Sequence, residues 1–170
     1  AAPDQQALAA EIEAASAFVL RVTPPVVLLA VSARVPLLHL LYSADFTPAA
    51  TLFGLLLAGD MAKVLAWCQG GVLLYRGHAR ASAVVSSAVW VLFGGISWAF
   101  VPRFGLEAVG FAYATAFVAQ VFVTGLGLWW VTGIRPSLRY MAHAVALVAG
   151  TVGLLLWTAH APWASVLVGG

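Results

Sequence analysis

An aspartate and a lysine stand three positions apart inside the apolar run FGLLLAGDMAKVLAW, residues 53–67. If this run crosses a bilayer as a helix, Asp60 and Lys63 lie near the middle of the hydrocarbon layer. Each charge there opposes insertion by about 2.5 to 3.5 kcal/mol, whereas the large apolar side chains of the span together favour it by roughly 3 to 6 kcal/mol. The gain does not clearly exceed the cost of two charges, so this span is not expected to face lipid on all sides.

The two charges share a helical stripe with Trp67 and Gly70. We therefore expect the stripe to face the inside of a helix bundle or a water-filled cavity. Two roles are open for the pair. It can neutralise itself and hold neighbouring helices together, or it can line a passage and meet a charged substrate or a coupling ion. We favour the second role, because ionisable groups at membrane depth mark transport pathways.

Arg34 is a third ionisable residue at membrane depth. It lies eight residues from Tyr42, the outer end of the first expected span, which is about 12 Å at helical rise. The span holds no acidic residue that could pair with it. Arg34 can extend its side chain to the outer interface, which requires a long reach, or face the same passage. We favour the passage, so the candidate substrate or ion pathway consists of Arg34, Asp60, Lys63 and Trp67. The amides of Gln69 and Gln120 are expected to hydrogen-bond across helices.

The sequence contains none of the motifs of covalent or metal catalysis. Its histidines have neither HxxH nor HExxH spacing, and one cysteine, Cys68, cannot build a cysteine-based zinc site. A nucleophile elbow, a phosphate-binding glycine-rich loop and a paired-carboxylate site are also missing. We expect a protein that is not an enzyme and that has no metal site and no cofactor.

The composition requires a membrane-embedded chain. Of the 170 residues, 63% are apolar and 8% charged, and the mean hydropathy is +1.00. Soluble domains carry about 25% charged residues, and a net charge of +2 gives no reason to expect nucleic-acid binding. The long apolar runs differ from the in–out alternation of membrane β-strands. We predict an all-α, polytopic transmembrane helical bundle with about five spans, near residues 17–42, 49–75, 82–101, 106–132 and 141–159.

The two ends of the chain differ from the spans. Residues 1–16 are predicted to form an amphipathic cytoplasmic segment that leads into the bundle of residues 17–159. Prolines 24 and 25 are expected to kink or restart the first helix, and Pro36 is a second weak point. Residues 160–170 are read as an outer segment that begins a truncated further span. We therefore expect this chain to be a fragment of a larger protein.

Arginines indicate the orientation. Arg76 and Arg80 lie at the second connector and Arg135 and Arg139 at the fourth, whereas the outer connectors hold only Arg103. Because Lys and Arg concentrate in cytoplasmic loops, we predict that the second and fourth connectors and the N-terminal segment are cytoplasmic.

Residues 40–80, LLYSADFTPAATLFGLLLAGDMAKVLAWCQGGVLLYRGHAR, resemble the C-terminal half of the Wzx-like O-antigen polysaccharide flippases. The shared elements are LYS, then Phe46 and an alanine pair, GD followed by Lys63, Trp67, and LLYRG at the turn. The segment VPRFGLEAVGFAYATA, residues 101–116, is similar to that family's next outer connector and helix. The resemblance covers roughly residues 10 to 133.

The resemblance implies the second lobe of a multidrug/oligosaccharidyl-lipid/polysaccharide exporter-type transporter in a bacterial cytoplasmic membrane. Such a protein moves an undecaprenyl-pyrophosphate-linked oligosaccharide across the membrane for polysaccharide biosynthesis. Its partners would be the lipid-linked substrate, the phospholipid bilayer and an N-terminal lobe of the same polypeptide. The alternatives are a cation-coupled drug antiporter or lipid II flippase of the same superfamily, and a non-transporting small membrane subunit.

Overall fold

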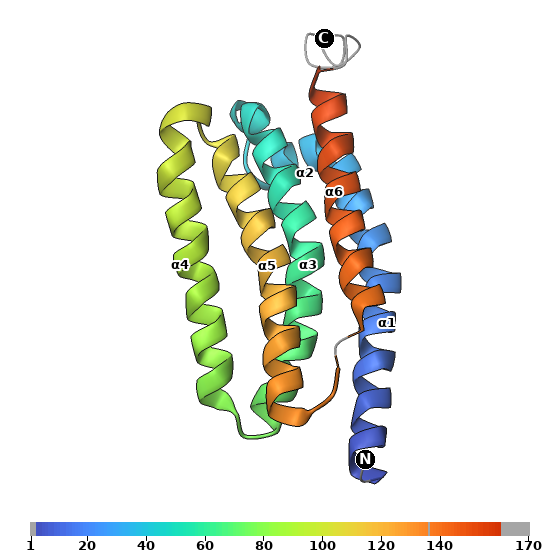
Figure 1. Cartoon of the computed structure of the whole chain (residues 1–170). Helices are drawn as coiled ribbons and strands as arrows, with labels where there is room; N and C mark the ends of the chain where they lie inside the picture. The colour runs from blue at the N-terminus through green and yellow to red at the C-terminus, as the bar shows by residue number, and fades with distance from the viewer. Residues whose placement is uncertain (1–2, 136, 161–170) are drawn as a thin grey trace.

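The computed structural model describes residues 3–135 and 137–160 as a bundle of long helices (Figure 1). This part of the chain contains α-helices and one short 3₁₀-helix but no strand, which confirms the all-α prediction. In chain order the elements are α1 (Pro3–Ser32), α2 (Arg34–Leu41), η1 (Ala44–Ala49), α3 (Ala50–Tyr75), α4 (Ala79–Phe104), α5 (Glu107–Thr132) and α6 (Leu138–His160).

Within the described residues, five helical stretches are long and apolar enough to cross a membrane, as expected of a multi-pass membrane protein. They cover residues 5–32, 44–75, 79–104, 107–132 and 138–158. The last four match the predicted spans to within a few residues. The first predicted span is divided between α1 and α2, and the predicted segment 1–16 is not a separate helix, since α1 runs from Pro3 without interruption. Residues 161–170 lie outside the described part of the chain.

The first helix breaks at a different proline from the pair that we expected. Both Pro24 and Pro25 lie inside α1, which continues to Ser32. The break falls at Ala33, and α2 begins at Arg34 with Pro36 in its first turn. A proline ring clashes with the carbonyl four residues earlier, and for Pro36 that carbonyl belongs to Ser32, the last residue of α1. The missing N–H of Pro36 is harmless in a first turn, where amides have no helical acceptor.

Helix α3 is the centre of the bundle. It packs against α1, α5 and α6, while α4 lies at the edge and packs mainly against α5 (Figure 1). Five side chains of α3 are fully buried at helical spacing, namely Leu55, Ala58, Ala62, Leu65 and Leu73. Burial of this face against three neighbours stabilises the bundle through close packing, which drives helix association in membranes.

Glycines allow α3 and α5 to approach closely. A Cβ atom added to Gly59 would lie 2.5 Å from Tyr113 Cδ1, and one added to Gly110 would lie 2.6 Å from Leu55 Cβ. Small residues of this kind are typical of membrane helix interfaces. The glycines of α4 behave differently: a Cβ at Gly94 or Gly95 would meet no atom of the described chain within 4 Å. Gly94 and Gly95 therefore bring no other helix of the described chain close to α4.

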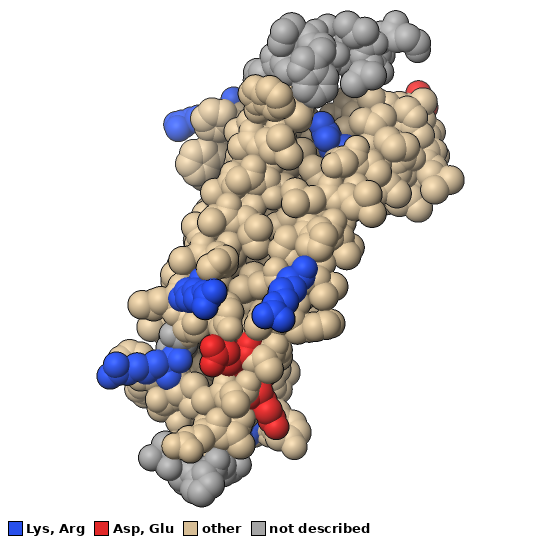
Figure 2. All heavy atoms as spheres, turned by 90° about the vertical axis from the view of Figure 1, so that its right-hand side faces the viewer, with Lys and Arg blue, Asp and Glu red and all other residues tan. Residues whose placement is uncertain are grey.

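The arginine-bearing connectors lie at the same end of the bundle as the start of α1. Gln5 Nε2 donates a hydrogen bond to the carbonyl oxygen of Thr132 over 3.2 Å, and the Tyr140 hydroxyl donates to Glu13 over 3.3 Å. On the face that α1 and α6 form, most charged side chains lie in the lower part, and a broad uncharged band separates them from the few near the other end (Figure 2). The helices therefore alternate in direction as the predicted topology requires.

Candidate functional site

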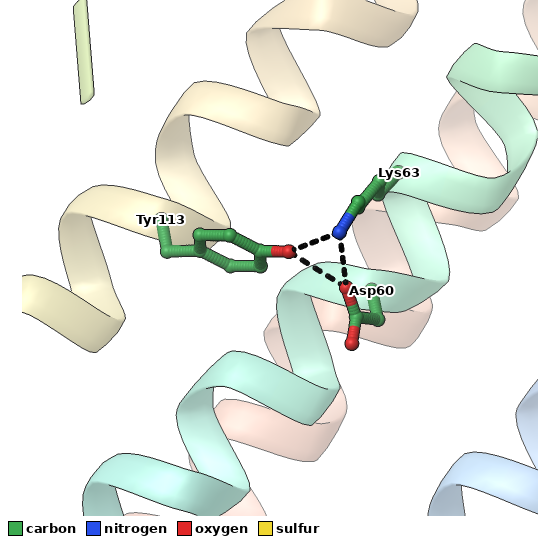
Figure 3. Close-up of polar contacts among 3 residues, drawn as sticks. All are labelled: Asp60, Lys63 and Tyr113. Atoms are coloured by element: carbon green, nitrogen blue, oxygen red, sulfur yellow. Dashed lines mark hydrogen bonds and ion pairs between the residues drawn. The ribbon is translucent and has the colours of Figure 1, made fainter. Parts of the chain in front are cut away.

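A hydroxyl group from α5 bridges the two charges of α3. The Tyr113 hydroxyl donates a hydrogen bond to Asp60 Oδ1 over 2.7 Å and accepts one from Lys63 Nζ over 2.8 Å (Figure 3). Lys63 Nζ also lies 3.4 Å from the same Asp60 oxygen. The three side chains, which we call the Lys63 cluster, therefore form a closed triangle of polar contacts between two helices.

The local sequence explains how this triangle forms. Positions three apart on a helix share a face, so Asp60 and Lys63 project from α3 side by side. Gly59 precedes them, and its missing side chain leaves the space that the Tyr113 ring occupies. The ring then extends along α3, and its hydroxyl reaches the pair. The close approach of the two helices at Gly59 is what brings the third member into the cluster.

Aromatic rings surround the Lys63 ammonium. Its nitrogen lies 4.9 Å from the ring centroid of Trp67, 5.3 Å from that of Phe117 and 5.4 Å from that of Tyr113. The Phe93 ring of α4 packs edge-on against Tyr113 at 5.8 Å. A cation within about 6 Å of a ring face is stabilised by the ring quadrupole, most strongly where water is scarce. The rings therefore add to the stabilisation that the Asp60 carboxylate gives the Lys63 ammonium at this depth.

The cluster is deep along the helix and open to the side. Asp60 is ten residues from the start of α3 and fifteen from its end, about 15 and 22 Å at helical rise. Yet the side chains of Lys63 and Asp60 are 22% and 39% exposed, and Trp67 is 61% exposed. The stripe that we expected to face the inside of a bundle or a cavity thus faces outward from the five helices. Both contacts to Asp60 use Oδ1, and Oδ2 has no hydrogen bond to the described residues.

Arg34 lies apart from the other predicted pathway residues. Its guanidinium donates to the carbonyl oxygen of Val31 over 3.0 Å and to Thr158 Oγ1 over 3.4 Å. Its Cδ atom lies against Gly54 of α3, nine residues before Lys63, which is about 2.5 helical turns and about 13.5 Å. The half turn beyond two full turns places Gly54 and Lys63 on opposite sides of α3. The structure therefore brings Asp60, Lys63 and Trp67 together and places Arg34 on the other side of α3.

The sequence analysis missed Tyr113 and Phe117. Neither residue is among the predicted pathway residues Arg34, Asp60, Lys63 and Trp67. A signal was present, because Tyr113 stands within an apolar span, seven positions into α5, where a hydroxyl needs a hydrogen-bond partner. The partner itself depends on the packing of two helices and could not be identified from local sequence.

A groove continues from the cluster along α3, between α3, α4 and α5. Its volume is about 340 Å³, and Trp67, Gly70, Ser82, Ser86, Gln120 and Thr124 are among the residues that line it. Gln120 is 5% exposed and Thr124 is 2% exposed, yet Gln120 Oε1 and Thr124 Oγ1 have no hydrogen-bond partner in the described chain. Gln69 Oε1 is likewise without a partner there. The two glutamines are buried as predicted, but these oxygens make no interhelical bonds.

Comparisons of the chain with models of protein families, with curated proteins and with solved structures find no match. What the site can do must be judged from its own chemistry. The Lys63 cluster offers an ammonium group, a partly exposed carboxylate and a hydroxyl that joins them. Such a set can bind an anion or exchange a proton. Within the described residues, no three His, Cys, Asp or Glu side chains gather into a group that could hold a metal ion.

Proposed function

We propose that this chain is one lobe of a membrane translocase that moves a lipid-linked oligosaccharide, an undecaprenyl-pyrophosphate glycan, across the bacterial cytoplasmic membrane. One observation carries the proposal: an ammonium group lies at least about 15 Å from either end of its helix, on the open side of the bundle. The resemblance of residues 40–80 to the Wzx-like flippases supports the same reading.

The open side of α3 is unsuited to lipid. A central charge exposed to acyl chains costs about 2.5 to 3.5 kcal/mol even on the mildest scale, and the Lys63 cluster exposes parts of two charges. A second lobe of the same polypeptide, facing this side across water, would remove that cost. The exposed stripe would then line the central cavity, where a polar head group could pass.

The ammonium of Lys63 can serve a pyrophosphate in that cavity. A lysine has three N–H donors. Two acceptors, the Tyr113 hydroxyl and Asp60 Oδ1, are already in place, and the third donor remains for a phosphate oxygen that arrives from the open side. Protonation of Asp60 would weaken its hold on Lys63 and strengthen the attraction of the ammonium for the phosphate. In this scheme Asp60 controls the strength of head-group binding.

The orientation follows from the arginines. The second and fourth connectors and the start of α1 lie at one end of the bundle. Arg76 and Arg135 lie in these connectors, and Arg80 and Arg139 lie in the first turns of α4 and α6 that follow them. In our proposal this end is cytoplasmic, by the positive-inside rule. The substrate would thus enter the cavity from the arginine-bearing end and leave at the end where η1 lies.

One further observation favours a second candidate, a cation-coupled antiporter. Asp60 is 39% exposed, and its Oδ2 has no hydrogen bond to the described residues, so a proton or a metal cation could bind there. This candidate requires Asp60 but not the charge of Lys63. The translocase requires the charge of Lys63 in every transport cycle.

Substitution at Lys63 separates the two candidates. In the complete protein, we expect Lys63→Gln to abolish surface polysaccharide in a strain that lacks its own flippase, whereas Lys63→Arg retains part of it. Antibody detection of the protein in isolated membranes controls for its amount. Normal export by Lys63→Gln at normal protein level would refute the translocase. Loss of drug resistance in Asp60→Asn, with resistance retained in Lys63→Gln, would establish the antiporter instead.

A further inference from the structure

We infer that the groove between α3, α4 and α5 is a binding site for uncharged sugar units, and that it holds the first sugars attached to the pyrophosphate. This inference rests on the proposed function and adds a second subsite to it. The observation behind it is a pair of residues that line the groove, Gln120 and Thr124, whose buried oxygens Oε1 and Oγ1 have no hydrogen-bond partner in the described chain.

Unsatisfied buried oxygens call for a ligand with hydrogen-bond donors. Leaving a buried polar group without a partner costs about 1 to 3 kcal/mol, and native proteins rarely tolerate it. Here the two oxygens belong to residues that line the same groove, and Ser82 and Ser86 line its α4 wall. Amides and hydroxyls both donate and accept. The matching ligand therefore carries many hydroxyl groups.

The groove offers no charged side chain that could pair with an ionic ligand. No Asp, Glu, Lys or Arg is among its lining residues, so a phosphate would find no counter-charge in the groove itself. Its volume of about 340 Å³ lies at the lower end of the range for small-molecule sites, about 300 to 1,000 Å³. It suits the first part of a glycan and not a complete oligosaccharide.

Small residues keep the groove open. A Cβ added to Gly70 would meet only the Thr124 methyl group, at 3.8 Å, and one added to Gly71 would meet no described atom within 4 Å. Trp67 lines one part of the groove with a large ring that is 61% exposed. Sugar rings present apolar C–H faces between their hydroxyl groups, and an aromatic face with polar neighbours accommodates both.

The groove adjoins the place where the phosphates would bind. Trp67 belongs to both sites, because its ring lines the groove and lies 4.9 Å from Lys63 Nζ. From Lys63 the stripe continues through Trp67 and Gly70 to Leu74, toward the arginine-bearing end. A glycan joined to a pyrophosphate at Lys63 can thus lie along this groove without a gap between the two subsites.

Binding of two lipids to the complete protein in nanodiscs tests the inference. The probes are undecaprenyl pyrophosphate and undecaprenyl pyrophosphate that carries a disaccharide. In the wild type we expect the disaccharide to strengthen binding. We expect Gln120→Met and Thr124→Val together to weaken binding of the disaccharide lipid about tenfold, as loss of two hydrogen bonds would, and to leave the sugar-free lipid unchanged. Both substitutions remove an oxygen that has no partner in the described chain, so the melting temperature should not fall.

Gln69→Met is the matched control. Gln69 has the same side chain, the same 5% exposure and an Oε1 without a partner in the described chain, but it lines a different recess near α1. It should leave both affinities unchanged. The inference is overturned if the disaccharide has the same effect on binding in wild type and double variant, or if Gln69→Met weakens binding equally. It is also overturned if the double variant binds the sugar-free lipid more tightly, because the groove would then hold an acyl chain.

A separate variant reports on the proposed function. Lys63→Gln should weaken binding of both lipids by a similar factor, since it removes the phosphate contact and leaves the groove intact. If Lys63→Gln has no effect on either lipid, or if neither lipid binds the wild type, the translocase proposal fails and the sugar subsite fails with it. If Lys63→Gln weakens both lipids and the groove variants change nothing, only the sugar subsite is wrong.

Discussion

The Tyr113 hydroxyl on α5 lies 2.7 Å from the Asp60 carboxylate on α3 and donates a hydrogen bond to it. The same hydroxyl accepts a hydrogen bond from Lys63. One neutral group thus holds an acid and a base of the neighbouring helix in a fixed arrangement at membrane depth. The arrangement leaves Asp60 Oδ2 without a contact to Lys63 or Tyr113 (Figure 3), and it joins the α3–α5 interface to the chemistry that we propose for the cavity.

Removal of the hydroxyl should weaken this interface. Tyr113→Phe keeps the ring against Gly59 but deletes two hydrogen bonds, so we expect the free energy of unfolding to fall by about 1 to 3 kcal/mol. Tyr140→Phe is the control, because its hydroxyl makes one exposed bond to Glu13 over 3.3 Å. Reversible unfolding of the purified protein in mixed micelles measures both. Equal effects of the two substitutions would show that the Tyr113 bridge adds no stability.

Two glycines should respond in opposite ways to the same substitution. Gly59→Ala places a methyl group 2.5 Å from Tyr113 Cδ1 and 3.1 Å from the Ala114 backbone, and such overpacking costs about 1 to 3 kcal/mol. Gly94→Ala meets no described atom within 4 Å and should be neutral or stabilising by up to about 1 kcal/mol, because alanine favours a helix. Melting temperatures in the same detergent test the contrast. Similar losses from both would mean that α3 and α5 do not touch at Gly59.

The coupling free energy between Asp60 and Lys63 depends on whether the pair is in contact with water or lies in a dry environment. In contact with water, an ion pair contributes about 0.2 to 1 kcal/mol, whereas loss of one partner in a dry site costs about 3 to 5 kcal/mol. We expect a double-mutant cycle of Asp60→Asn and Lys63→Gln to give a coupling free energy of about 1 kcal/mol in unfolding measurements. A coupling above about 3 kcal/mol would place the pair in a dry environment and contradict a water-filled cavity.

Arg34 and Lys63 should differ in function. Arg34 binds Thr158 and the Val31 carbonyl on the opposite side of α3 from Lys63. We therefore expect Arg34→Gln to lower the melting temperature but to leave export per molecule of protein within about twofold of the wild type. Export assays normalised to protein in the membrane provide the test, with Lys63→Gln as the comparison. Loss of export in a fully folded Arg34→Gln protein would show that Arg34 takes part in transport, and would contradict its exclusion from the pathway.

The fold could be predicted from the sequence to the extent that it depends on local composition. Apolar runs of sufficient length identify the spans, and the spacing of Asp60 and Lys63 shows that they lie side by side. What could not be predicted depends on how helices rotate against each other. The partner of the pair, Tyr113, and the position of Arg34 behind α3 follow from that rotation. Likewise, glycine has the same local preference at positions 59 and 94, but only one of the two faces a neighbouring helix.

The prolines illustrate the same limit. A proline removes one helical hydrogen bond wherever it stands, so Pro24, Pro25 and Pro36 are similar signals in the sequence. Only Pro36 coincides with a break, between Ser32 and Arg34. The other two lie inside a helix that continues across them. Whether a helix continues is decided by the packing of the residues on either side, and local sequence does not contain that information.

Water access to the open side of α3 tests the central claim most directly. In a Cys68→Ser background of the complete protein, Trp67→Cys adjoins the Lys63 cluster. Val91→Cys lies on α4 twelve residues from the arginine-bearing end, as Lys63 does on α3, and its native side chain is 75% exposed. Labelling with a membrane-impermeant maleimide in cells and inverted vesicles measures access from each side. We predict that Trp67→Cys reacts from at least one side and that Val91→Cys reacts from neither. If Trp67→Cys is as unreactive as Val91→Cys, the cluster faces lipid, and the proposed cavity does not exist.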